Sequence, residues 1–98
     1  MTVYTVGIWI VKAGREEDFV RAWQELGDET KSDFPNARGT LVRDREQTNK
    51  FISFGPWEST EQIEQWRASE TFKVSVGKIR ELLEDFTPHT MDLAAQVR

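Results

Sequence analysis

Apolar residues occupy both alternations of the first segment of the chain, Thr2–Val11. The run is rich in β-branched and aromatic side chains, which favour a strand. Tyr4 and Ile8 fall on one alternation, and Trp9 and Val11 fall on the other. A strand that is apolar on both faces is buried on both faces. The pattern therefore predicts a first strand with a layer of protein over each face.

The hydrophobic period changes from two to about 3.6 after Arg15. Phe19, Trp23 and Leu26 lie on one helical face, and three acidic residues follow Arg15 directly. Acidic side chains in a first turn are favoured by the helix dipole. The segment is predicted to be a helix that ends before Pro35, because the residue preceding a proline avoids helical geometry.

Two short apolar runs follow, Gly39–Arg45 and Lys50–Trp57. The polar residues 46–49 between them predict a hairpin turn, although the Asn-Gly pair typical of tight hairpins is missing. Pro56 is expected to end the second of these strands.

Ser59 begins a capping box with Gln62 and predicts the start of the second helical region. Ile63 and Trp66 follow at helical spacing, so both are expected to point inward. Ser69 is predicted to start a new helix after a short break.

Apolar residues then recur at steps of four and three from Phe72 to Phe86, which predicts a helix that Thr87–Pro88 terminates. The alternation from His89 to Val97 predicts a last strand, half-buried. The order βαββαβ indicates one domain over residues 1–98, of the α+β class, with a ferredoxin-like fold and an antiparallel sheet.

The helices of this fold cover one face of the sheet. Because strands one and three are also apolar on the other face, we expect a homodimer with the two sheets face to face.

The composition excludes several kinds of chemistry. The chain has no cysteine and one histidine, so it lacks both a thiolate and the clustered ligands of a metal site. It has no glycine-rich phosphate loop, and we expect it to need no cofactor. A net charge of −4 without a basic stripe argues against nucleic acid. No signal peptide or membrane span is visible, and we expect a cytoplasmic protein.

Two interpretations are open for several candidate residues. Trp66 belongs either to the core or to the wall of a pocket for a flat ligand, and its indole N–H needs a partner when buried. His89 is either a half-buried structural histidine or a ligand contact at a pocket rim. The hydroxyl of Tyr4 either reaches a pocket or faces solvent.

Three segments carry a resemblance to a known family: Lys12–Phe19, Pro56–Ser59 and Glu61–Phe72. With them the chain resembles the antibiotic biosynthesis monooxygenase superfamily from Val3 to Val97. The resemblance implies a ferredoxin-like protomer that forms a dimeric α+β barrel through its sheets.

The enzymes of that superfamily fall into two branches. One degrades haem, using an asparagine in the first strand and a histidine ten residues after the tryptophan. By resemblance these positions fall on Gly7 and Val76, whose side chains cannot hydrogen-bond or ligate iron. Haem degradation is therefore disfavoured.

The other branch oxidises anthrone-type polyketides to quinones with O₂ and without metal or flavin. Its substrate contacts are a tryptophan, an asparagine, a tyrosine and an arginine. By resemblance these fall on Trp66, Gln62 and Phe72, with the arginine near Phe86.

We therefore predict a cofactor-independent monooxygenase that oxidises a planar aromatic or quinol-type small molecule with O₂. The alternative is a non-catalytic dimer that binds a small aromatic ligand. The candidate residues are Trp66, Gln62 and His89 for catalysis, and Phe72, Phe19 and Tyr4 for substrate binding.

Overall fold

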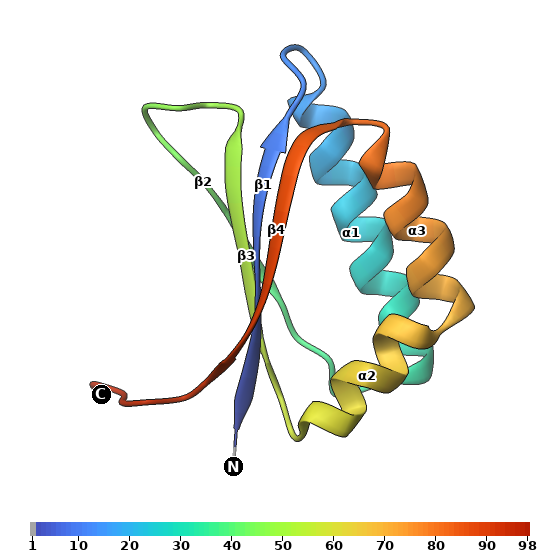
Figure 1. The fold of residues 1–98 in the computed structure, drawn as a ribbon, viewed down its shortest axis with the longest axis vertical. Helices are drawn as coiled ribbons and strands as arrows, with labels where there is room; N and C mark the ends of the chain where they lie inside the picture. Colours follow the sequence, from blue (N-terminus) through green and yellow to red (C-terminus); the bar gives the residue numbers. More distant parts are fainter. Residues whose placement is uncertain (1) are drawn as a thin grey trace.

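The structure, a computed structural model, describes residues 2–98. Figure 1 shows an antiparallel sheet with all the helices packed on one of its faces. The elements are β1 (Val3–Val11), α1 (Glu16–Asp33), β2 (Thr40–Arg43), β3 (Lys50–Trp57), α2 (Thr60–Ala68), α3 (Glu70–Arg80) and β4 (Leu83–Asp92). The strand order is β2-β3-β1-β4. The predicted α+β, ferredoxin-like βαββαβ fold is confirmed.

Gly14 lies in the turn just before Arg15, the N-cap of helix α1, and its φ of +86° suits a residue without a side chain. Arg15 donates to the Asp18 carboxylate at 2.9 Å, and Arg21 pairs with the same carboxylate. The hydrogen bond from Arg15 is the main reason that the pKa of Asp18 lies below its usual value. The first turn of α1 is thus fixed by polar contacts at the surface.

The β2–β3 hairpin turn is built by Asp44 in place of an Asn-Gly pair. Its carboxylate accepts the backbone N–H groups of Glu46 and Gln47, each at 2.8 Å. These bonds also lower the pKa of Asp44, with the Gln47 contact the larger cause. An Asp side chain that binds its own following backbone is a common turn device, and it explains how residues 46–49 reverse the chain.

The predicted break between the two helices lies at Ser69, which ends α2 and begins α3. Its hydroxyl donates to the Trp66 carbonyl at 2.7 Å and accepts the backbone N–H of Phe72 at 3.2 Å. One side chain therefore closes one helix and caps the next.

The end of the second helical region differs from the prediction. Helix α3 stops at Arg80 instead of Thr87, and β4 already begins at Leu83. The helix-like spacing beyond Arg80 comes from a β-bulge in the strand: Val11 pairs with Leu83 while Ile10 pairs with Asp85. The extra residue puts Leu83 and Phe86 on one face although they are three positions apart, a spacing that imitates a helix.

The last strand is also shifted toward the N-terminus. It contains Pro88 and ends at Asp92, whereas a strand from His89 to Val97 was predicted. Pro88 is accommodated because β4 is an edge strand, where the missing N–H breaks no ladder on the outer side.

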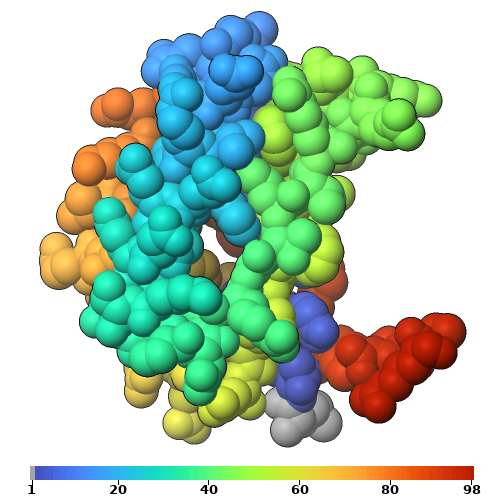
Figure 2. All heavy atoms as spheres, turned by 180° about the vertical axis from the view of Figure 1, so that it is seen from behind, coloured from blue at the N-terminus to red at the C-terminus, as the bar shows by residue number. Residues whose placement is uncertain are grey.

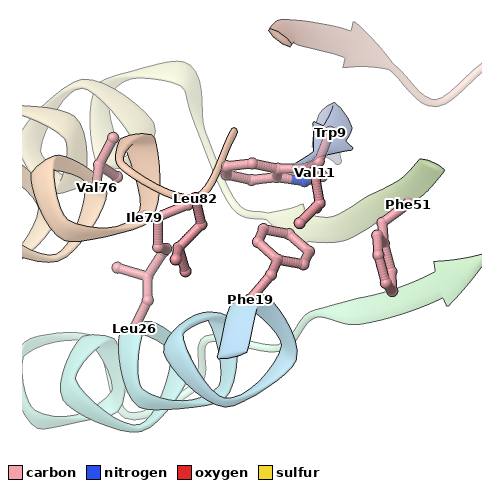
Figure 3. Packing of buried hydrophobic residues seen from close by; sticks show 8 residues of the cluster. All are labelled: Trp9, Val11, Phe19, Leu26, Phe51, Val76, Ile79 and Leu82. Atoms are coloured by element: carbon pink, nitrogen blue, oxygen red, sulfur yellow. The ribbon is translucent and has the colours of Figure 1, made fainter. Parts of the chain in front are cut away.

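The main core lies between the sheet and the helices, as Figure 3 shows. Phe19 is fully buried, with its ring centroid 5.3 Å from that of Trp9 and 4.9 Å from that of Phe51. Trp9 in turn stacks on Phe86 at 4.0 Å. These aromatic contacts join α1 to β1, β3 and β4.

Within residues 2–98 no helix covers the opposite face of the sheet (Figure 1). The strand register places Val6, Ile8 and Ile52 on this face. Val42, Phe54 and Met91 also lie there and are 46%, 40% and 46% exposed. We call these six residues the open-face patch.

Candidate functional site

A cavity of about 880 Å³ lies between the sheet and the helices. It reaches from the β2 edge of the sheet, at Arg38 and Thr40, to the β4 edge, at Phe86 and Pro88. In Figure 2 a hollow opens between α1, in cyan, and the green segment that leads into β2. The volume falls in the range of about 300–1,000 Å³ that is usual for small-molecule sites.

Aromatic side chains form much of the cavity wall. The ring centroids of Trp66 and Phe72 are 4.7 Å apart, at an interplanar angle of 69°. Trp57 lies 5.0 Å from Trp66 on the other side. All three line the cavity, so the space has the flat apolar surfaces that suit an aromatic ligand.

Trp66 is held in place at both its backbone and its ring. Ser69 binds its carbonyl, and its indole N–H donates to Thr30 Oγ1 at 2.9 Å. Thr30 is buried, and its hydroxyl donates a hydrogen bond to the Leu26 carbonyl at 2.6 Å. The buried partner that Trp66 required is therefore on α1, and the indole presents its ring, not its N–H, to the cavity.

The sheet side of the cavity has a glycine at a close approach. A Cβ on Gly7 would lie 2.8 Å from Trp9 Nε1 and 2.9 Å from Ser53 Oγ. Without that Cβ, the Trp9 indole reaches across Gly7 and donates to Ser53 at 2.9 Å. Trp57 makes a similar contact with Thr5 at 3.2 Å. Two hydroxyl groups, each bound by an indole, therefore lie on the cavity floor.

The charged side chains at the cavity are mostly basic, although the whole chain carries −4. The lining includes one acid, Asp28, and four bases, which are Lys31, Arg38, Arg67 and Arg80. Within residues 2–98 none of these bases forms a salt bridge. The rim therefore favours a ligand that is negatively charged or becomes so.

The loop before β2 borders the cavity because it packs on a glycine in β3. A Cβ on Gly55 would lie 2.2 Å from the Arg38 carbonyl oxygen and 3.2 Å from Gly39 Cα. Only a residue without a side chain permits this approach. Gly55 thus sets the position of Arg38 at the mouth.

Of the residues predicted to bind substrate, Phe72 lines the cavity and so does Trp66, predicted to be catalytic. Phe19 does not border the cavity, because its ring fills the core beneath Trp9. The other three predicted residues lie elsewhere.

Gln62 faces a smaller hollow beside Pro56 and Trp57. Its amide oxygen accepts the Glu58 backbone N–H at 3.4 Å, so it works as part of the α2 cap. Tyr4 and His89 lie on the open face of the sheet, in register with Met91 and Val6 respectively. The sheet separates both of them from the cavity.

The sequence reading missed Thr5, Thr30 and Ser53. Thr5 shares an alternation with Trp9 and could have been placed on the helix side from that signal alone. Thr30 and Ser53 become polar partners only through contacts with residues 36 and 44 positions away, and no local pattern contains such pairs.

A family model matches most of the chain. The model described as antibiotic biosynthesis monooxygenase matches residues 2–78. The chain belongs to the antibiotic biosynthesis monooxygenase family. None of the curated proteins compared matches the chain.

Several solved structures share the fold at low identity. A variant of SnoaB, a cofactor-independent oxygenase from Streptomyces nogalater, aligns over 98% of this chain and 96% of its own, with a TM-score of 0.87 and 18% identity. A structure described as an antibiotic biosynthesis monooxygenase covers 95% and 99%, with a TM-score of 0.81 and 19% identity. A conserved protein from Methanosarcina mazei Go1 covers 92% and 90%, with a TM-score of 0.81 and 16% identity.

Two further observations concern the described part of the chain. Residues 2–98 contain no group of three or more histidine, cysteine or acidic side chains placed to hold a metal ion. None of the helices there is long and apolar enough to cross a membrane.

Proposed function

We propose that this member of the family is a cofactor-independent monooxygenase that oxidises a planar aromatic or quinol-type molecule with O₂. The observation that carries the proposal is the aromatic cavity formed by Trp57, Trp66 and Phe72 in a chain of this family. The similarity to SnoaB, itself described as a cofactor-independent oxygenase, supports it.

The reaction needs little chemistry from the protein. An anthrone-type substrate loses a proton, and the resulting anion reduces O₂. One oxygen atom replaces the two hydrogens of the reacting carbon as a new carbonyl, and the other leaves as water. The cavity contributes by excluding water, holding the ring flat and stabilising the anion. The basic rim residues Arg38, Arg67 and Arg80 suit that anion.

We assign ring contact to Trp66 and Phe72, which border the cavity directly. Phe19 supports Trp9 from behind, and Gln62 fixes the start of the Trp66 helix. Tyr4 and His89 have no place in this cavity, and in our proposal they belong to the open face of the sheet. A cytoplasmic location remains our prediction from the composition.

Haem degradation fits the cavity poorly. Gly7 and Val76 both line the cavity and offer no ligand atom for iron in their side chains. The chain's histidine, His89, faces away from it. The donor set therefore does not suit a haem iron.

A non-catalytic ligand-binding protein is the second candidate. It is favoured by Phe72 and Phe86, which stand at or near the positions where the resemblance implies a tyrosine and an arginine, so that two polar contacts implied by the resemblance are missing.

Oxygen uptake distinguishes the two candidates. We expect anthrone, mixed with the pure protein, to consume O₂ at a rate proportional to protein concentration, with equimolar anthraquinone as product. Tryptophan fluorescence that is quenched by anthrone, without O₂ uptake above that of the control, would support the binding protein instead. Heat-denatured protein at the same concentration is the control for uncatalysed oxidation.

We also propose a homodimer formed through the sheet faces. The open-face patch is apolar, continuous across the strands and free of helices in the protomer. Contiguous apolar surface of this kind marks an interface, and a second copy of the same face is its simplest partner.

Replacing Ile8 by glutamate tests the dimer, since Ile8 lies on the central strand β1 of this face. The wild type is expected to have the mass of two chains in light scattering at micromolar concentration, and Ile8→Glu the mass of one, because a buried unpaired charge is costly. Val74→Glu is the matched control, as Val74 is 54% exposed on α3. A wild-type protein with the mass of one chain would refute the proposal.

A further inference from the structure

Two hydroxyl groups on the cavity floor accept a hydrogen bond but do not donate one within residues 2–98. Thr5 on β1 and Ser53 on β3 are half-buried and line the cavity. Each accepts an indole N–H, from Trp57 and Trp9 respectively. Among residues 2–98 neither hydroxyl donates a hydrogen bond of its own.

The two hydroxyls lie on the same face of neighbouring strands. Thr5 pairs with Gly55, and Gly7 pairs with Ser53, so the hydroxyl-bearing residues are diagonal neighbours. Such neighbours are typically about 7–8 Å apart. On their other sides Thr5 pairs with Thr90 and Ser53 with Leu41, and both hydroxyl-bearing residues line the cavity.

The indoles prepare both hydroxyls to donate. A hydroxyl that accepts an N–H bond becomes a stronger donor, because linked hydrogen bonds polarise one another. It also loses rotational freedom, since one lone pair is fixed by the indole. Donors that are oriented before the ligand arrives stabilise developing negative charge most effectively.

We propose that Thr5 and Ser53 bind oxygen substituents of a planar phenolic substrate and stabilise its phenolate form. The inference rests on the proposed function, because it assigns the polar contacts of the same cavity. It replaces the expectation that Gln62, His89 and Tyr4 supply them. The ligand class is a flat ring system with at least one ionisable hydroxyl, seated with its oxygens toward the sheet.

A coloured phenol that cannot be oxidised further makes this testable. We use 2-hydroxyanthraquinone, which already has the quinone oxidation state and changes its visible absorption on ionisation. Bound to the wild type, its hydroxyl is expected to titrate about two pH units below that of the free probe. Each hydrogen bond to the anion accounts for roughly tenfold in the ionisation constant.

The double variant Thr5→Val/Ser53→Ala is expected to return the bound probe to about its free titration midpoint. Thr5→Ser/Ser53→Thr retains both hydroxyls and is expected to keep the wild-type midpoint. Near-UV circular dichroism of both variants checks that the tryptophans remain packed. A bound probe that titrates equally in the wild type and in Thr5→Val/Ser53→Ala would overturn the inference.

The test separates this inference from the proposed function. If the wild type consumes O₂ with anthrone but the probe titrates alike in the wild type and the double variant, only the hydroxyl assignment fails. If the wild type neither quenches on addition of the probe nor oxidises anthrone, both fail.

Discussion

Replacing Trp66 by alanine is expected to lower the free energy of unfolding by about 3 kcal/mol and to abolish oxidation of anthrone. Truncating a large aromatic side chain in a packed environment costs about 3–5 kcal/mol, and we take the lower end because one face of Trp66 borders the cavity. The change removes packing against both Trp57 and Phe72. It also leaves Thr30 without its indole partner. Urea denaturation measures the stability, O₂ uptake with anthrone measures the oxidation, and fluorescence titration with anthrone measures binding.

Trp66→Phe is the matched control for this prediction. It retains an aromatic ring between Trp57 and Phe72 but loses the hydrogen bond to Thr30. We expect a loss of about 1 kcal/mol in stability and retention of most ligand affinity, because the indole N–H is turned away from the cavity. A Trp66→Ala protein as stable and as active as the wild type would show that the ring neither packs nor binds as described.

Replacing Gly55 by alanine is expected to displace the loop before β2 and to weaken ligand binding at the mouth. The added Cβ would lie 2.2 Å from the Arg38 carbonyl oxygen, so the backbone of one segment has to move. Overpacking of this kind costs about 1–3 kcal/mol. Because Arg38 and Thr40 line the cavity, we expect a weaker affinity for anthrone as well as a lower midpoint of urea denaturation.

Gly77→Ala provides a control that is expected to change the stability in the opposite direction. Gly77 lies within α3, and a Cβ there meets no atom within 4 Å. Alanine favours a helix over glycine by about 1 kcal/mol, so this variant is expected to be more stable than the wild type with unchanged ligand affinity. If Gly55→Ala behaved as Gly77→Ala does, the close approach of the Arg38 loop would be refuted.

Much of the fold was readable from local patterns. The doubly apolar first strand, the α1 face with Phe19 and Leu26, and the break at Ser69 all follow from short-range spacing and capping chemistry. These features depend on residues within a turn or two of each other, which is the range over which periodicity carries information.

The boundary between α3 and β4 shows where that reasoning fails. Leu83 and Phe86 continue a helical spacing in the sequence but belong to a strand. The β-bulge opposite Ile10 and Val11 is what places both residues on one face of the strand. A bulge exists only once two strands are paired.

In the candidate site, too, some residues were predictable from the sequence and others were not. Trp66 was predicted because helical periodicity turns it inward, and Phe72 because the family resemblance places a substrate contact there; both line the cavity. Gln62, His89 and Tyr4 were selected as polar side chains near the expected pocket, but the direction of a side chain on a strand depends on which face the helices cover. Because the helices cover the other face, Tyr4 and His89 lie on the side of the sheet away from the cavity.

The sequence by itself determined the order of elements, the family and the aromatic character of the cavity, because each is carried by residues close together along the chain. The tertiary structure alone decided which polar groups reach that cavity. Ser53 meets Trp9, and Thr30 meets Trp66, through contacts 44 and 36 residues apart. Gly55 holds Arg38 at the mouth only because β3 passes beneath the loop. Such pairs arise from the packing of strands and helices, which local spacing does not specify.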